Sequence, residues 1–148
     1  MRRFILDTNI CLAYIRGNAL YTKVELDHNL SNPDTMVLIS VVTKAELFSL
    51  AIQNNWENKK LGILDSLLKK LFIIDINEND KDLIDSYGSI DAFSHGRLYS
   101  KPLKMSSRNM GKNDLWIAAT AHVAKASLIT TDSDFDHLAG NFIEVLKY

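Results

Sequence analysis

Residues 4–15 read FILDTNICLAYI, and the rest of the chain repeats the pattern that this stretch begins. The apolar run 4–6 has the length and character of a short buried strand, and it ends at Asp7. From Ile10 onward the apolar positions continue over 12–15 as a helix would place them. A strand that leads directly into a helix, with an acid at the junction, is the opening unit of an α/β fold.

The same alternation of strands and helices continues along the chain. We expect further strands at short apolar runs and helices at longer segments with helical spacing. The expected strands are 36–39, 71–74, 127–130 and 142–145, and the expected helices are 10–15, 21–30, 41–51 with Ser40 as N-cap, 61–68, one from 79 or 80, and one from 113 or 114 to 121. Such alternation predicts a three-layer α/β/α sandwich with a mostly parallel central sheet.

The composition is typical of one soluble globular domain. The chain has 148 residues, of which 47% are hydrophobic and 24% charged, so we expect a single domain over residues 1–148. No apolar stretch approaches the ~20 residues that cross a bilayer, and Asp7 comes before any signal-peptide apolar region could form. We therefore expect a cytoplasmic protein without a membrane segment. The one cysteine, Cys11, is interpreted as a buried core thiol.

Four acidic residues lie at or just after the expected strand-to-helix junctions. Asp7 and Asp132 follow strands, Asp114 begins a helix, and Glu46 lies about one turn into the helix after the second strand. Ligands of an open parallel sheet bind outside the carboxyl ends of its strands, where loops and helix N-termini converge. We therefore expect these four carboxylates to lie close together.

Each of these acids also has a purely local interpretation. Asp7 can cap the helix that follows it, and Asp132 can form an Asx-type turn. Asp114 suits the first turn of a helix because of the helix dipole, and Glu46 completes a capping-box pattern with Thr43. Taken singly, each acid is as compatible with a local role as with a site.

Carboxylates that converge need something to neutralise them. At about 5 Å and an effective dielectric near 20, each pair repels by roughly 3 kcal/mol, against a domain stability of about 5–15 kcal/mol. Either raised pKa values keep some carboxyl groups protonated, or a hard divalent cation such as Mg²⁺ or Mn²⁺ is bound. Zinc is not expected, because there is no cysteine cluster and no histidine pair at ligand spacing; His28, His95, His122 and His137 are interpreted as structural or surface residues.

Four segments resemble the signature blocks of PIN domains, in particular those of the VapC-like toxins of type II toxin–antitoxin pairs. The segments are 4–10, 40–47, 113–121 and 128–135, and the third is the most specific. Their order and spacing extend over the whole chain. The resemblance implies a parallel sheet between helices and a ribonuclease that hydrolyses phosphodiester bonds with Mg²⁺ or Mn²⁺.

The resemblance also implies roles for the acids. Asp7 and Asp114 would be the main metal ligands, Asp132 would complete the set, and Glu46 would bind through water or orient the attacking water. Asp134 is either a further partner of these ligands or only the start of a turn. Nearby short polar residues suit the fixing of a carboxylate or a water, and equally suit turns and caps; they are Thr8, Asn9, Thr130 and Thr131.

A basic stretch precedes Asp114. Residues 92–113 contain no Asp or Glu, and we expect 94–111 to be a helix end that continues into a loop. The net charge of -1 gives no overall attraction to nucleic acid, so a local basic surface matters more. We hypothesise that this stretch binds the RNA backbone, with a solvated loop as the alternative; its proposed RNA-binding residues are Lys101, Lys104, Arg108 and Lys112.

Two other functions are compatible with parts of the pattern. A PIN fold could bind RNA or a protein without cutting, although the presence of all four acids argues against this. A phosphotransfer enzyme with Asp7 as nucleophile would need a second acid close by, whereas Thr8, Asn9 and Ile10 follow. As a toxin, the chain would have a cognate antitoxin that covers the acidic site, and it would form a homodimer through apolar helices near the first and second blocks.

Overall fold

Five parallel strands form one central sheet in the computed structural model, which describes residues 1–148. Neighbouring strands pair in parallel in the order β3-β2-β1-β4-β5. The strands are β1 (Arg2–Leu6), β2 (Thr35–Ser40), β3 (Phe72–Ile74), β4 (Ser127–Thr130) and β5 (Val145–Lys147). The three-layer α/β/α sandwich predicted from the alternation is confirmed, and the sheet is parallel throughout.

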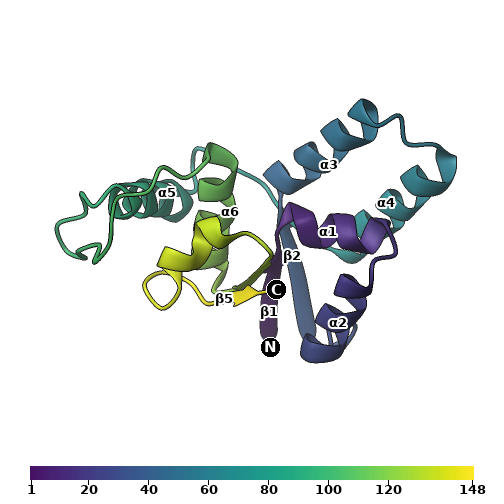
Figure 1. Cartoon of the computed structure of the whole chain (residues 1–148), viewed down its shortest axis with the longest axis horizontal. Coiled ribbons are helices and arrows are strands. Elements are labelled where there is room, and N and C mark those ends of the chain that lie inside the picture. The colour runs from purple at the N-terminus through teal and green to yellow at the C-terminus, as the bar shows by residue number, and fades with distance from the viewer.

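Helices cover both faces of this sheet. In Figure 1, α1 to α4 lie on one side of the strands, and α5 and α6 lie on the other. The helices are α1 (Thr8–Ile15), α2 (Ala19–His28), α3 (Val41–Gln53), α4 (Asn58–Lys70), α5 (Lys81–Ser94), α6 (Lys112–Ala124) and the short 3-10 helix η1 (Ser133–Leu138). None of these helices has the length and apolar character needed to cross a membrane.

Alternating side chains of the strands supply two separate cores. In β1, Ile5 packs with residues of α5 and α6, whereas Phe4 and Leu6 pack with residues of α1, α2 and α4. In β4, Leu128 and Ile129 divide between the two cores in the same way. This period of two follows from the pleat of a strand, and it explains why these strands read as continuous apolar runs.

The starts of α3 and α5 agree with the sequence because a side chain caps each helix. Ser40 caps α3 by accepting a hydrogen bond from the Val42 N–H, as expected, and Asp80 caps α5. The expected helix 21–30 was shifted by two residues: α2 begins earlier because Asn18 caps it, and it ends before Asn29, whose φ of 51° is left-handed.

The last expected strand, 142–145, was wrong. Strand β5 begins only at Val145, where the expected strand ends. Phe142 instead closes the turn after η1, with its N–H bonded to the Leu138 carbonyl at 3.0 Å, and Ile143 makes only an isolated bridge with Ala139. The apolar character of residues 142 and 143 reflects packing against the α5–α6 core rather than strand pairing.

Candidate metal centre

Acidic side chains gather where β1, β2 and β4 end. Asp7 directly follows β1, Asp132 comes two residues after β4, and Glu46 lies in the second turn of α3, which follows β2. Asp114 lies in the first turn of α6. The negative charges of Asp7, Asp132, Glu46 and Asp134 all act on the Asp114 carboxyl group, so the structure brings the four expected acids and Asp134 into one electrostatic unit.

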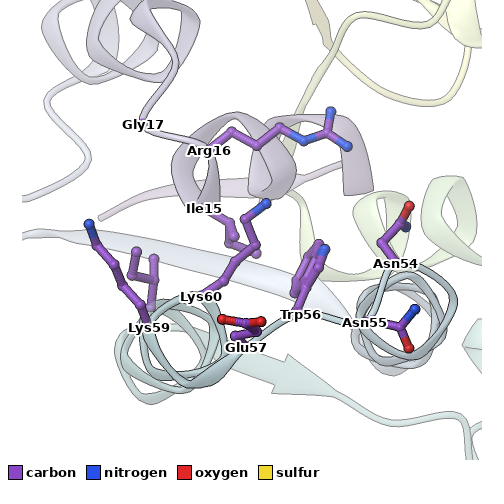
Figure 2. Close-up of a pocket in the computed structure, with 10 residues that line it drawn as sticks. Ile15, Arg16, Gly17, Asn54, Asn55, Trp56, Glu57, Lys59 and Lys60 are labelled. Carbon is purple, nitrogen blue, oxygen red and sulfur yellow. The ribbon is translucent and has the colours of Figure 1, made fainter.

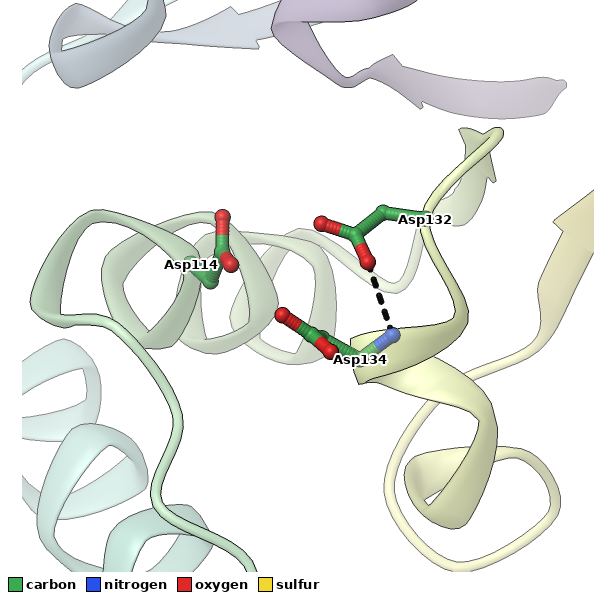
Figure 3. A group of neighbouring side chains, drawn as sticks. All are labelled: Asp114, Asp132 and Asp134. Atoms are coloured by element: carbon green, nitrogen blue, oxygen red, sulfur yellow. Dashed lines mark hydrogen bonds between the residues drawn. The ribbon is translucent and has the colours of Figure 1, made fainter.

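Three of these carboxylates face one another directly. Asp114, Asp132 and Asp134 each place one oxygen within 4.8 Å of the oxygens of the other two (Figure 3). Asp132 also accepts a hydrogen bond from the Asp134 N–H at 2.9 Å, which sets the turn between them. An all-carboxylate group of this kind provides the hard oxygen ligands that Mg²⁺ and Mn²⁺ prefer.

Asp134 therefore belongs to the cluster, although the sequence left its role open. It lies two positions after Asp132 and four after the last residue of β4, and η1 directs its side chain toward Asp114 (Figure 3). The spacing Asp-Ser-Asp after a strand was visible in the sequence. What the sequence did not reveal is that a 3-10 turn follows, which puts both acids on the same side.

Asp7 lies beside this group in a buried position with both carboxylate oxygens hydrogen-bonded. It is 5% exposed. One oxygen accepts from the Thr8 N–H at 2.8 Å, and the other accepts from the Thr130 hydroxyl at 2.7 Å. The Thr130 oxygen in turn accepts from the Asp132 N–H at 2.9 Å. Thr130 thus joins the acid after β1 to the acid after β4, and the capping role of Asp7 coexists with its place in the cluster.

Glu46 is connected to the first strand-to-helix junction rather than to its own helix start. The Thr8 hydroxyl donates to one Glu46 oxygen at 3.0 Å. The capping-box interpretation was wrong, because Ser40 caps α3 and the Thr43 hydroxyl is buried without a hydrogen-bond partner. Glu46 is therefore free to take part in the site.

Asn9 and Thr131 lie at the rim of the cluster and contact each other. The Asn9 amide donates to the Thr131 hydroxyl at 3.3 Å. Neither residue bonds to an acid in the way that Thr8 and Thr130 do. Their contact instead links the start of α1 to the loop after β4.

Two carboxyl groups at this site, those of Asp114 and Asp7, hold protons more tightly than ordinary carboxyl groups. Burial, reinforced by the charges of the neighbouring acids, raises the pKa of Asp114 to about 7. Burial also raises the pKa of Asp7, although hydrogen bonds from Thr130 and Thr8 oppose the shift. Because no hydrogen bond offsets the charge of Asp114, this group has the most to gain from a cation.

The four expected RNA-binding residues fall into two environments. The Lys101 ammonium group donates to the Asn141 carbonyl and lies 4.8 Å from the centre of the Phe142 ring, so this side chain ties the loop to the C-terminal turn. Lys104, Arg108 and Lys112 are exposed, and Lys112 lies two residues before Asp114 in α6.

A hollow of about 640 Å³ lies away from the acids, between the end of α1 and the α3–α4 connection (Figure 2). Arg16, Trp56, Lys59 and Lys60 are among its lining residues, and the Lys60 ammonium group lies 5.3 Å from the centre of the Trp56 ring. Helix α1 starts beside Asp7 and ends at this hollow, so the two features occupy opposite ends of one helix. The hollow is not part of the candidate metal centre.

Comparisons with known proteins agree with this arrangement. The PIN domain family model matches residues 4–141. VapBC2 from Rickettsia felis, solved with a DNA fragment from its promoter, is 25% identical over 99% of this chain and 98% of that chain, with a TM-score of 0.72. VapBC-1 from nontypeable Haemophilus influenzae is 25% identical over 98% and 97%, with a TM-score of 0.69. No curated protein matches the chain.

The stability of the metal-free protein is expected to fall as the pH rises. The pKa of Asp114 is raised from 3.8 to about 7 on folding, so its stabilising contribution is complete below pH 3.8 and is lost as the pH rises through about 7. In EDTA the melting temperature should therefore decrease between about pH 4 and 7, and Asp114→Asn should flatten the decrease. Scanning fluorimetry across this range measures the effect.

Asp85→Asn is the control, because Asp85 is an exposed carboxylate on α5 that pairs with Lys81. It should leave the pH dependence unchanged. Identical pH profiles for the wild type and Asp114→Asn would contradict the raised pKa.

Proposed function

We propose that this chain, which belongs to the PIN-domain family, is a metal-dependent endoribonuclease that acts as a single domain over residues 1–148. The observation that carries the proposal is the carboxylate group of Asp114, Asp132 and Asp134, with Asp7 and Glu46 held beside it. Burial, and after it the charges of the neighbouring acids, raises the pKa of Asp114. Perturbed groups of this kind concentrate at functional sites.

A divalent cation, Mg²⁺ or Mn²⁺, would be held at this cluster by Asp114, Asp132 and Asp134, with Asp7 on the buried side. When bound it would supply a water of lowered pKa and positive charge close to the scissile phosphate. Thr130 keeps Asp7 and the Asp132 backbone in place. Thr8 holds one oxygen of Glu46, so the other oxygen is available to accept a proton from the attacking water.

The position of Asp7 argues against an aspartyl phosphotransfer mechanism. Its side chain is buried, and each of its oxygens already accepts a hydrogen bond. A nucleophile must reach the phosphorus in line, which requires an accessible oxygen. Hydrolysis by a water needs no such exposure of Asp7, and it agrees better with the geometry.

The activity test is RNA cleavage by the purified protein with Mg²⁺ or Mn²⁺. We expect EDTA to stop cleavage, and Asp114→Asn and Asp132→Asn each to lower the rate by at least about 100-fold, since even residues behind metal ligands contribute 10- to 100-fold. Asp85→Asn, at an exposed carboxylate of α5 outside both the acidic cluster and the α3–α4 groove, should cleave like the wild type. Cleavage that persists in EDTA would overturn the metal mechanism, and RNA binding without cleavage under all conditions would favour the non-cutting PIN module.

We also propose that the protein is the toxin of a toxin–antitoxin pair and that the tail of a cognate antitoxin covers the acidic site. The support comes from the VapBC structures of Rickettsia felis and Haemophilus influenzae, which match nearly the whole chain at 25% identity. A cluster of carboxylates at the surface attracts a basic segment by simple charge complementarity. The same negative charges that would bind a cation would thus also favour binding of the antitoxin tail.

The exposed basic residues of the loop before α6, together with Lys112 at the start of α6, are proposed to hold the RNA backbone. Lys104→Ala, Arg108→Ala and Lys112→Ala should each weaken RNA binding in EDTA and reduce the slope of log affinity against log salt by about 0.7. Filter binding or fluorescence anisotropy with a single-stranded RNA measures both. Lys125→Ala is the control, because Lys125 is an exposed lysine at the opposite end of α6 from Asp114. If all four substitutions weaken RNA binding equally, the basic residues before Asp114 are not a specific RNA-binding surface.

A homodimer is proposed through α3 and α4. These helices border an apolar groove of about 330 Å³ with three large exposed side chains, Phe48, Ile52 and Leu61. Contiguous exposed apolar surface of this kind is typical of an interface. Ile52 is 78% exposed, so Ile52→Lys should shift the protein toward monomer in sedimentation velocity without affecting the fold.

The control for the dimer is Leu26→Lys on α2. Leu26 is 79% exposed, as Ile52 is, but it lies outside the α3–α4 groove. A dimer that resists Ile52→Lys, or that responds equally to both substitutions, would exclude this surface.

A further inference from the structure

Ser94 and His137 form a buried polar contact that the proposed chemistry does not use. Ser94 is the last residue of α5, and His137 lies in η1, 43 residues later. The Ser94 hydroxyl oxygen and the His137 Nε2 are 2.7 Å apart. The two residues are 0% and 4% exposed, so neither can touch an RNA substrate directly.

On one side, this contact reaches the base of the basic loop. The Ser94 hydroxyl also lies 3.4 Å from the Met110 sulfur, and the Ser94 carbonyl accepts from the Arg108 N–H at 2.7 Å. The hydrogen bond between Ser94 and Arg108 therefore holds together the two ends of the loop 94–108. Lys101 and Lys104 lie within this loop.

On the other side, the contact reaches the acids of the candidate metal centre. His137 shares η1 with Asp134, and Asp132 caps the same short helix. The His137 ring stacks on Phe93 of α5, with ring centroids 6.2 Å apart and planes at 6°. The bond to Ser94 is the one side-chain hydrogen bond that joins η1 to the α5–α6 layer; the others from η1 run to Asp132, to the following turn and to Lys147.

The placement of η1 decides how close the carboxylates come. Asp114 belongs to α6, which packs against α5, whereas Asp132 and Asp134 belong to the chain after β4. A 3-10 helix has poorer hydrogen-bond geometry than an α-helix and depends on its surroundings for rigidity. Whatever ties η1 to the α5–α6 layer therefore sets the distance between Asp114 and the other two acids.

We propose that Ser94 and His137 are positioning residues: they hold η1 against α5 so that Asp132 and Asp134 face Asp114, and they connect the base of the basic loop to the metal centre. This role rests on the proposed function. In this proposal the affinity for metal depends on the Ser94–His137 hydrogen bond, although neither residue contacts the metal or the RNA. Residues that orient metal ligands change affinity by about 10- to 100-fold, and for a contact one step further away we expect about 3- to 10-fold.

The test compares Ser94→Ala with Thr120→Val. Thr120 is a matched buried hydroxyl at 1% exposure, but it donates only to the Trp116 carbonyl of its own helix α6. Mn²⁺ affinity is measured by titration calorimetry without RNA, together with the rate of limited proteolysis between residues 95 and 107. Ser94→Ala should bind Mn²⁺ about 3- to 10-fold more weakly and be cut faster in the loop, whereas Thr120→Val should match the wild type in both.

His137→Gln provides the conservative variant. A glutamine amide can still donate toward the Ser94 oxygen, so this variant should keep an affinity close to that of the wild type even where Ser94→Ala folds poorly. If the wild-type protein binds Mn²⁺ and the Ser94→Ala and Thr120→Val variants bind it with equal affinity, the positioning role is overturned and the metal centre is not. A wild-type protein that binds no Mn²⁺ overturns the proposed metal centre and the positioning role with it.

Discussion

Repulsion among the carboxylates at the ends of β1, β2 and β4 is the constraint to which the surrounding residues respond. Hydrogen bonds from Thr8 and Thr130 stabilise the charges of Glu46 and Asp7. Asp114 receives no such bond, and burial together with the neighbouring acids raises its pKa to about 7. The chain thus offsets part of the repulsion itself, and the proposed cation would offset the rest, so that a metal site can be built without making the metal-free fold unstable.

The parallel sheet makes this concentration of charge possible. In a parallel sheet all strands end at the same edge, so acids that are far apart in sequence meet there without any special loop. Two cores, one on each face, keep β1 in place between β2 and β4. The hydroxyl of Thr130 then joins the neighbouring strand ends through Asp7 and the Asp132 backbone. The rigidity of the sheet is therefore transmitted directly to the acids.

Expectations from the sequence succeeded where local chemistry decides the outcome. Ser40 caps α3 because a serine after a strand can accept an N–H of the next helix, and that interaction depends on neighbours in the sequence. Expectations were wrong where distant packing decides: Phe142 and Ile143 are apolar because they pack on a core, not because they belong to a strand of the sheet. The capping-box pattern at Glu46 was wrong for the same reason, since Thr8 from another helix takes its carboxylate.

By itself the sequence determined the α/β alternation, the strand-to-helix junctions and the identity of the acids at them, because these depend on periodicity and on residue type. Only the tertiary structure decided which acids face one another and that Asp134 is among them. It also decided that Ser94 of α5 contacts His137 of η1. Those contacts join residues far apart in the chain, and their distances depend on how helices pack on a sheet. The free energy of that packing comes from contacts spread over both cores, so no local pattern in the sequence encodes it.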